Sequence, residues 1–231
     1  MSLILNIDTA LDTASVCLSK DNELLQITVN ENQKEHAMWL HTAIADILQK
    51  SGHTINELQA VAVSIGPGSY TGLRVGLASA KGFCYALNIP LIAISTLKMI
   101  AVAVKEEATG VNLICPMIDA RRMEVFTNLY DQLLTEKNTA RAMIIDENSF
   151  SAMLGSNRIL FCGNGSKKLQ KIITSPNALF KIMQTKDHTH FSNQLYFPIQ
   201  TDRKGNWCPA SWQYQFLLYC LPPPQEQNML H

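Results

Sequence analysis

The sequence predicts an α/β protein made of two related halves, each with a mixed β-sheet and helices packed on it. Two observations favour this fold class. Residues 1–108 alternate strand-like and helix-like patterns, in the order three strands, helix, strand, helix, strand, helix. The pattern of an apolar strand, a turn and a second strand then begins again after Thr109-Gly110. We therefore expect a first domain over residues 1–108 and a second domain over residues 109–231.

Three strands open the first domain, at residues 3–7, 14–19 and 24–29. The first is a nearly continuous apolar run, and the second alternates in polarity. Helices and strands then alternate, and they are expected at residues 34–51 (helix), 60–65 (strand), 71–87 (helix), 90–94 (strand) and 96–107 (helix).

The helix over residues 34–51 has the clearest helical pattern. Its apolar residues fall on one stripe, and Gly52 provides a C-terminal stop. The stripe consists of Ala37, Leu40, Ile44, Ile47 and Leu48. Met38, Thr42 and Ala45 lie opposite, so the helix also has a weakly polar outer face.

The second domain repeats the start of the first. Residues 113–119 resemble residues 3–8, because both are apolar strands that end in Ile-Asp, and each precedes a turn and a second strand. Residues 158–162 are predicted to form a further strand, followed by a turn at Gly163-Asn164-Gly165 and a short helix near residues 167–173. From about residue 188 no helical or strand periodicity persists for long, so we expect an atypical C-terminal tail there.

Composition excludes several classes of protein. Lys plus Arg is 19 and Asp plus Glu is 19, which gives no net charge. Proteins that bind nucleic acid alone normally have a basic excess, so another subunit would have to hold any RNA. No apolar run approaches the roughly 18 residues of a membrane helix, and the N-terminus does not resemble a signal peptide. We expect a cytoplasmic protein that makes no membrane contact, with its six widely spaced cysteines buried and reduced.

A glycine-rich loop is the most informative segment. It joins a buried strand to a helix, a geometry in which backbone N–H groups face an anion or a neighbouring backbone. It lacks the Gly-Lys-Ser/Thr of a P-loop. Two interpretations stay open, a phosphate-binding loop and a tight structural turn. The loop residues are Gly66, Pro67, Gly68, Ser69, Tyr70, Thr71 and Gly72.

The helix after this loop is poor in charge and rich in small residues. Arg74 and Lys81 are its only charged residues between Leu73 and Leu87. A glycine inside a helix costs about 1 kcal/mol relative to alanine, which close packing of another backbone can offset. The helix is therefore either covered by its own domain or covered by a partner. The small residues are Gly76, Ser79, Ala80 and Gly82.

Other candidate residues have simpler interpretations. His36 and His41 are five residues apart, which separates them by about 140° on a helix and argues against a shared metal ion. Arg121-Arg122 and the lysines at 167, 168 and 171 are basic clusters typical of a solvated surface. No GxSxG nucleophile elbow, catalytic carboxylate pair or Cys/His arrangement is present in the sequence.

Several of these features together resemble one protein family. They are Ile7-Asp8-Thr9-Ala10, His36, the run Gly66–Gly76 with Ala80-Lys81-Gly82, and the segment Ile118–Val125. On these features the chain is similar to the bacterial TsaB (YeaZ) family over roughly residues 1–185. The resemblance implies a two-domain actin/Hsp70/sugar-kinase-like fold. It also implies a role in making N6-threonylcarbamoyladenosine, next to the anticodon of tRNAs that read codons starting with A.

In this family TsaB is the non-catalytic partner that binds and activates TsaD, the subunit that transfers the threonylcarbamoyl group. TsaE is the associated ATPase, and a TsaB homodimer is a further expectation. The resemblance implies that tRNA is bound only through the complex, and that ATP or ADP is bound only at the interface with TsaD. TsaD-type relatives carry an HxxxH metal pair where this chain has Ile94–Ile100 without histidine, so iron or zinc is expected on TsaD and not here.

The resemblance also implies site residues. Pairing is expected through the two helices described above, at Met38, Thr42, Ala45, Leu73, Arg74, Gly76, Leu77, Ala80 and Lys81. In sugar-kinase and actin-like folds, the strand ends hold nucleotide phosphates and magnesium. The matching positions, expected to be vestigial here, are Asp8, Thr9, Asp119 and Arg121. The alternative function is an enzyme of the same fold, either a nucleotide hydrolase using Asp8, Thr9 and Asp119 or a residual metallopeptidase, which the missing histidines disfavour.

The C-terminal tail departs from the family. Tyr196-Phe197-Pro198 is only a fragment of the acidic, aromatic segment with which relatives usually end. A shifted reading frame and a lineage-specific end both remain open as explanations.

Overall fold

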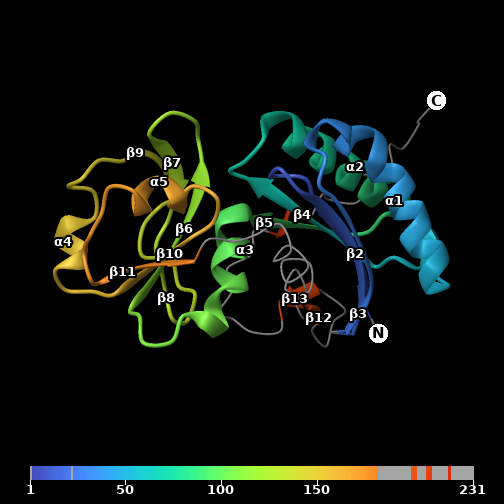
Figure 1. Cartoon of the computed structure of the whole chain (residues 1–231). Helices are drawn as coiled ribbons and strands as arrows, with labels where there is room; N and C mark the ends of the chain where they lie inside the picture. Colours follow the sequence, from blue (N-terminus) through green and yellow to red (C-terminus); the bar gives the residue numbers. More distant parts are fainter. Residues whose placement is uncertain (1, 22, 182–198, 202–206, 210–217, 220–231) are drawn as a thin grey trace, which may run out of the picture.

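The computed structural model describes residues 2–21, 23–181, 199–201, 207–209 and 218–219. Two mixed β-sheets lie side by side, with one helix between them (Figure 1). This confirms the predicted fold class. Most of the predicted tail, from about residue 188, lies outside the described residues.

The first sheet has the strand order β14-β5-β4-β1-β2-β3. β1 pairs in parallel with β4, which pairs in parallel with β5, and β2 and β3 continue the sheet antiparallel. The strands are β1 (Leu3–Asp8), β2 (Ala14–Lys20), β3 (Glu23–Asn30), β4 (Ala60–Gly66), β5 (Leu91–Ser95) and β14 (Leu218–Tyr219).

Two long helices cover one face of this sheet, α1 (His36–Ser51) and α2 (Tyr70–Leu87) (Figure 1). Their inner residues join Leu5 and Ile7 of β1 in one hydrophobic cluster. α1 ends as predicted, because Gly52 adopts a left-handed conformation and its N–H bonds the carbonyl groups of Gln49 and Leu48. In the predicted stripe Ala37 is exposed, whereas Ala43 is buried.

The second sheet has the order β11-β10-β6-β7-β9, with β8 on β6. Its central strand repeats the pairing of β1, because β6 is antiparallel to β7 and parallel to β10. Helices α4 (Ser151–Leu154) and α5 (Ser166–Gln170) cover one face. The strands are β6 (Leu113–Asp119), β7 (Glu124–Thr127), β8 (Tyr130–Asp131), β9 (Arg141–Ile144), β10 (Ile159–Cys162) and β11 (Ala178–Lys181).

Helix α3 (Thr96–Ala103) packs between the two sheets. Leu97 and Ile100 belong to a single hydrophobic cluster that contains Ile4 of β1 and Ile114 of β6. The halves therefore share one core, and the domain boundary at residues 108 and 109 stays a prediction.

Several boundaries differ from those predicted. The helix expected over residues 96–107 ends at Ala103 and continues as a separate 3-10 turn, Lys105–Glu107. The helix expected near residues 167–173 is α5, which is shorter. Two more 3-10 turns, Gln33–Glu35 and Ile55–Glu57, flank α1. Near the end of the chain, β12 (Ile199–Thr201) pairs with β13 (Trp207–Pro209). No helix in the described part of the chain is long and apolar enough to cross a bilayer.

Candidate functional site

The glycine-rich loop packs directly against the turn that follows β1. The backbone N–H of Ser69 donates to the carbonyl of Ala10 at 2.7 Å. A Cβ atom on Gly68 would overlap that same carbonyl, and one on Gly72 would overlap the carbonyl of Thr9. Both glycines are therefore explained by the close approach of two backbones. This favours the interpretation of the loop as a tight structural turn, whereas a phosphate-binding role stays a prediction.

Asp8 and Thr9 are occupied by bonds within the chain. Asp8 Oδ1 accepts hydrogen bonds from Ser64 Oγ at 2.6 Å and from the N–H of Ala10 at 3.0 Å. Thr9 Oγ1 donates to the carbonyl of Gly72 at 2.7 Å. Both side chains are buried, and neither lines the cleft described next. Their geometry ties β1 to β4 and α2.

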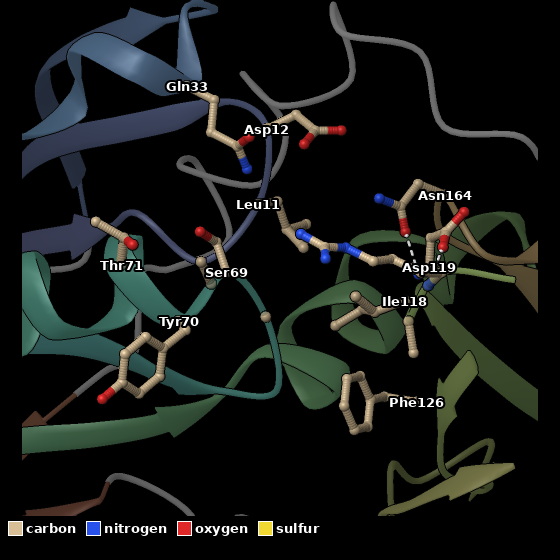
Figure 2. Close-up of a pocket in the computed structure, with 14 residues that line it drawn as sticks. Leu11, Asp12, Gln33, Ser69, Tyr70, Thr71, Ile118, Asp119, Phe126 and Asn164 are labelled. Atoms are coloured by element: carbon tan, nitrogen blue, oxygen red, sulfur yellow. Dashed lines mark hydrogen bonds between the residues drawn. The ribbon is translucent and has the colours of Figure 1, made fainter. Parts of the chain in front are cut away.

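A cleft of about 600 Å³ lies between the two halves. One wall comes from the turn at residues 10–12, from Gln33 and from residues 68–71, where the glycine-rich loop leads into α2. The other wall comes from residues 118–121, with Phe126 and Asn164. Figure 2 shows Ser69, Tyr70 and Thr71 on one side and Ile118, Asp119 and Asn164 on the other. Of the four expected nucleotide positions, Asp119 and Arg121 line this cleft.

Asp119 is the organising carboxylate of the second wall. Its Oδ1 accepts from the N–H of Arg121 at 2.6 Å and from Lys168 Nζ at 2.7 Å. Its own N–H donates to Asn164 Oδ1 at 2.9 Å (Figure 2). Partial burial acts to raise the pKa of Asp119, but the hydrogen bonds from Lys168 and Arg121 outweigh it and hold the pKa below its ordinary value.

The two histidines of α1 lie in different environments. His36 is buried beside the first turn. Burial lowers the pKa of His36, although the backbone groups of Asn30 and Asp12 and the charges of Asp8 and Asp12 partly oppose this. His41 is exposed, with its Nε2 3.3 Å from Ser79 Oγ of α2. Among the residues that the structure describes, no three His, Cys, Asp or Glu side chains gather as ligands for a metal ion.

The cysteines whose side chains are described are buried thiols, as predicted. Burial raises the pKa of Cys17 and Cys115 to about 12 and that of Cys84 to about 11, and it also raises the pKa of Cys162. Such thiols are poor nucleophiles at neutral pH. The side chain of Cys208 and the whole of Cys220 lie outside the described part of the chain.

Helix α3 contains residues 96–100, part of the segment from 94 to 100 in which this chain has no histidine. Thr96 and Ile100 are both fully buried in the core between the sheets. Lys98 is also buried, which lowers its pKa, while the charge of Glu136 acts in the opposite direction. The main contribution of this helix is apolar packing.

The predicted partner surface on α1 and α2 is only partly outward-facing. Five of its nine residues are exposed: Met38, Thr42, Ala45, Arg74 and Lys81. Leu73 and Leu77 are half-buried and pack against the core. Arg74 lies over the ring of Tyr70, with the guanidinium carbon 5.3 Å from the ring centroid.

Two of the nine predicted residues are buried within the chain. They are Gly76 and Ala80, and their part in partner contact stays a prediction. A Cβ on Gly76 would overlap Thr9 Oγ1, which explains this glycine by packing within the chain.

The sequence interpretation missed Tyr85, which is 80% exposed on α2. Ala78 and Gly82 are exposed on the same helix. The signal was their spacing, because positions 78, 82 and 85 recur at helical intervals and share one face.

Comparison with known proteins gives a consistent family. The family model described as "TsaD: tRNA N6-adenosine threonylcarbamoyltransferase" matches residues 24–195. The tRNA threonylcarbamoyladenosine biosynthesis protein TsaB of Bacillus subtilis is 35% identical over 127 residues, which are 55% of this chain and 54% of that protein. The Escherichia coli TsaB is 35% identical over 133 residues, 56% and 55% of the two chains. The chain thus spans about half the length of these curated relatives.

Solved structures agree on the fold. YeaZ from Pseudomonas aeruginosa has a TM-score of 0.67 and 22% identity, covering 83% of this chain and 91% of that chain. A second structure, described as an uncharacterized Pseudomonas aeruginosa protein with similarity to peptidase YeaZ, has a TM-score of 0.69 and 23% identity, covering 80% and 85%. The family model that matches residues 24–195 covers more than half of the chain and, with the similarity to the TsaB relatives, shows that the chain belongs to the TsaB/YeaZ family.

Proposed function

We propose that this chain is a non-catalytic subunit that binds a TsaD-type threonylcarbamoyltransferase and activates it. The pair would modify N6 of the adenosine next to the anticodon in tRNAs that read codons starting with A. Family membership supports the pathway. The observation that carries the proposal is the outer face of α1 and α2, and above all Gly82.

Gly82 lies inside α2, and no contact in the described part of the chain explains it. A Cβ there would meet no atom of the described residues within 4 Å, unlike one on Gly72 or Gly76. The residue still costs about 1 kcal/mol relative to alanine. A second backbone that packs against α2 at this point would offset that cost, because only glycine permits the closest approach.

The surroundings of Gly82 suit a protein partner. Met38 of α1 and Tyr85 of α2 are 76% and 80% exposed, which is unusual for large apolar side chains on two neighbouring helices. The contact of His41 with Ser79 links the two helices. Aromatic residues and methionine are enriched in protein interfaces. A face of this kind supports a heterodimer with TsaD or a homodimer.

Helix α3 supports the non-catalytic half of the proposal. The family resemblance places the histidines of the transferase relatives in the segment from residue 94 to 100, which has no histidine here, and the side chains of Thr96 and Ile100 are fully buried. We infer that the metal, the transfer chemistry and the main tRNA contact belong to the TsaD subunit. TsaE would act on the pair, and ATP or ADP would bind only where the two subunits meet. We expect the complex to act in the cytoplasm.

The alternative, a nucleotide hydrolase, is less well supported. It depends on Asp8, Thr9 and Asp119. The first two are buried and hydrogen-bonded within the chain, and Asp119 is bonded to Lys168. ATP turnover by the isolated chain would favour this alternative.

Reconstitution of tRNA modification tests the proposal. TsaD, TsaE and the synthase that makes threonylcarbamoyl-adenylate are incubated with tRNA, ATP, bicarbonate and labelled threonine, with and without this chain. We expect label in tRNA only when the chain is present. Equal incorporation without it would contradict the activating role.

Two variants show whether the helical face is responsible. Gly82→Leu is expected to weaken the pair with TsaD at least ten-fold, and modification should fall with it. Ile144→Ala is a suitable control, because Ile144 is 74% exposed but lies on β9. Equal effects of the two substitutions would move the partner surface away from α1 and α2.

A further inference from the structure

We infer that the turn between β6 and β7, together with helix α5, forms a secondary contact for the phosphate backbone of RNA. We call this surface the basic patch. It consists of Arg121, Arg122, Lys167, Lys168 and Lys171. The inference rests on the proposed function, which provides an RNA substrate, and it adds a contact that this subunit would make itself.

The fold brings together two basic clusters that are far apart in the sequence. Lys168 Nζ lies 2.7 Å from Asp119 Oδ1 and 3.0 Å from the carbonyl of Glu124. Asp119 and Glu124 flank the Arg121-Arg122 turn on its two sides. Lys168 therefore joins α5 to the turn, and the two clusters form one surface.

Lys167 of α5 and Lys171, the residue that caps its C-terminus, lie on the same side of the helix. Residues 167, 168 and 171 fall within an arc of about 100°, because each residue turns the helix by that angle. Lys168 faces the turn, and Lys167 and Lys171 are exposed beside it. Arg121 and Arg122 are exposed as well. The basic patch thus contains four exposed cations and the bonded Lys168.

The turn holds its arginines in an unusual backbone conformation. Arg121 and Arg122 have φ angles of 70° and 44°, in the left-handed region. For residues with a Cβ this costs about 1–2 kcal/mol each. The conformation is fixed by two hydrogen bonds, from the N–H of Arg121 to Asp119 Oδ1 and from the N–H of Glu124 to the carbonyl of Arg121. The two arginine stems consequently leave the turn from fixed positions.

The charge of the patch differs from that of the whole chain. The chain has 19 basic and 19 acidic residues, and its net charge is zero. The patch has five basic residues, and two acidic residues, Asp119 and Glu124, lie next to them. The local charge is therefore five minus two, or +3. A surface of this size adds to the binding of a polyanion held elsewhere, but is too small to bind one tightly alone.

The arrangement favours an extended phosphate chain over a single nucleotide. Arg121 lines the cleft, whereas Lys167 and Lys171 are exposed at and just after α5. Guanidinium groups bond two phosphate oxygens at once, and lysines contribute point charges along a backbone. An RNA strand at the mouth of the cleft would meet both kinds of residue.

The test compares two double variants that remove the same charge. Arg122→Ala/Lys171→Ala alters the basic patch, and Lys20→Ala/Lys50→Ala alters the first sheet and α1. Each is combined with TsaD, and binding of an unmodified tRNA is measured at several salt concentrations. The patch variant is expected to weaken binding several-fold and to reduce the slope of log affinity against log salt by about one to two. The control variant should match the unaltered chain.

Two further measurements separate this inference from the proposed function. Pairing with TsaD is measured without RNA, and the patch variant should pair normally. If the unaltered chain fails to pair, the proposed function is wrong. RNA binding by the chain alone at low salt then decides the inference: weak binding that the patch variant loses would support it. The inference is overturned if the patch variant behaves like the control in both RNA measurements, or if it loses binding of ATP but not of RNA.

Discussion

The turns that follow β1 and β6 hold equivalent places in the two halves, yet their surroundings differ. Each of these two strands ends in Ile-Asp. A segment that contains glycines follows the parallel neighbouring strand, β4 or β10, in the sequence, and it packs close to that strand end. In the first half these glycines contact Thr9 and Ala10, which come after the aspartate. In the second half Gly163 and Gly165 approach Met117 and Ile118, which come before it, and Gly165 also approaches the backbone nitrogen of Asp119.

This small shift gives the two turns different roles. The first turn is covered, and its Asp8 is bonded to Ser64. The second turn is left exposed, with Asp119 bonded to Lys168 and two arginines beside it. One strand-turn-strand plan has thus produced a structural joint in one half and an accessible charged turn in the other.

Glycine substitution should affect the covered turn most. Gly72→Ala is expected to lower the free energy of unfolding by about 3 kcal/mol, because the added methyl group overlaps a backbone carbonyl. Gly82→Ala, ten residues along the same helix and in open space, should instead raise it by up to about 1 kcal/mol. Urea unfolding at pH 7 measures both. Equal effects would show that the close approach at Gly72 is not what stabilises the joint.

Removing the partner of the buried aspartate should have the next largest effect. Ser64→Ala takes one donor from Asp8, and we expect a loss of about 1–3 kcal/mol because the carboxylate stays buried. The same unfolding measurement applies. A loss below 0.5 kcal/mol, within the usual range for a surface substitution, would mean that Asp8 obtains its stabilisation from other groups.

The covered turn should also make stability depend on pH through His36. Its pKa in the folded protein is lowered, so the unfolded chain binds a proton more readily. Stability from this residue is complete above the ordinary pKa of about 6.5 and falls as the pH drops below it. We expect the free energy of unfolding to decrease between pH 7.5 and pH 5.5, and His36→Gln to flatten that decrease. An unchanged slope in the variant would assign the effect to other groups.

The exposed turn should respond least. Lys168→Ala is expected to change stability by no more than about 1 kcal/mol, as for other surface ion pairs. It should also move the pKa of Asp119 up toward its ordinary value, which an NMR titration of the carboxyl carbon would detect. The contribution of this carboxylate is present above its unfolded pKa and is lost as the pH falls through the lower folded value. A large loss of stability would make this turn a structural joint as well.

The first half could be predicted well from the sequence because its elements are long and regular. α1 and α2 each contain several turns with a clear apolar stripe, and β1 and β4 are nearly continuous apolar runs. The second half has elements too short for periodicity, such as β8 with two residues and α4 with four. Such segments are specified by contacts with the rest of the fold.

The candidate site was less predictable for the same reason. Sequence patterns identified both Asp8 and Asp119 as strand ends. They did not reveal the hydrogen-bond partners, because Ser64 is 56 residues from Asp8 and Lys168 is 49 residues from Asp119. Small residues on α2 were recognised, but not that Gly76 faces β1 while Gly82 faces outward. Distinguishing them requires the position of the helix on the sheet.

Helix α3 has a mechanical consequence. In a two-lobed protein that closes on a ligand, the lobes rotate about a hinge. Here Leu97 and Ile100 are buried in one core with residues of both sheets, so rotation would expose apolar surface at about 25 cal/mol for every Å². The lobes should therefore move as one rigid body, with the width of the cleft set by the fold and not by its contents.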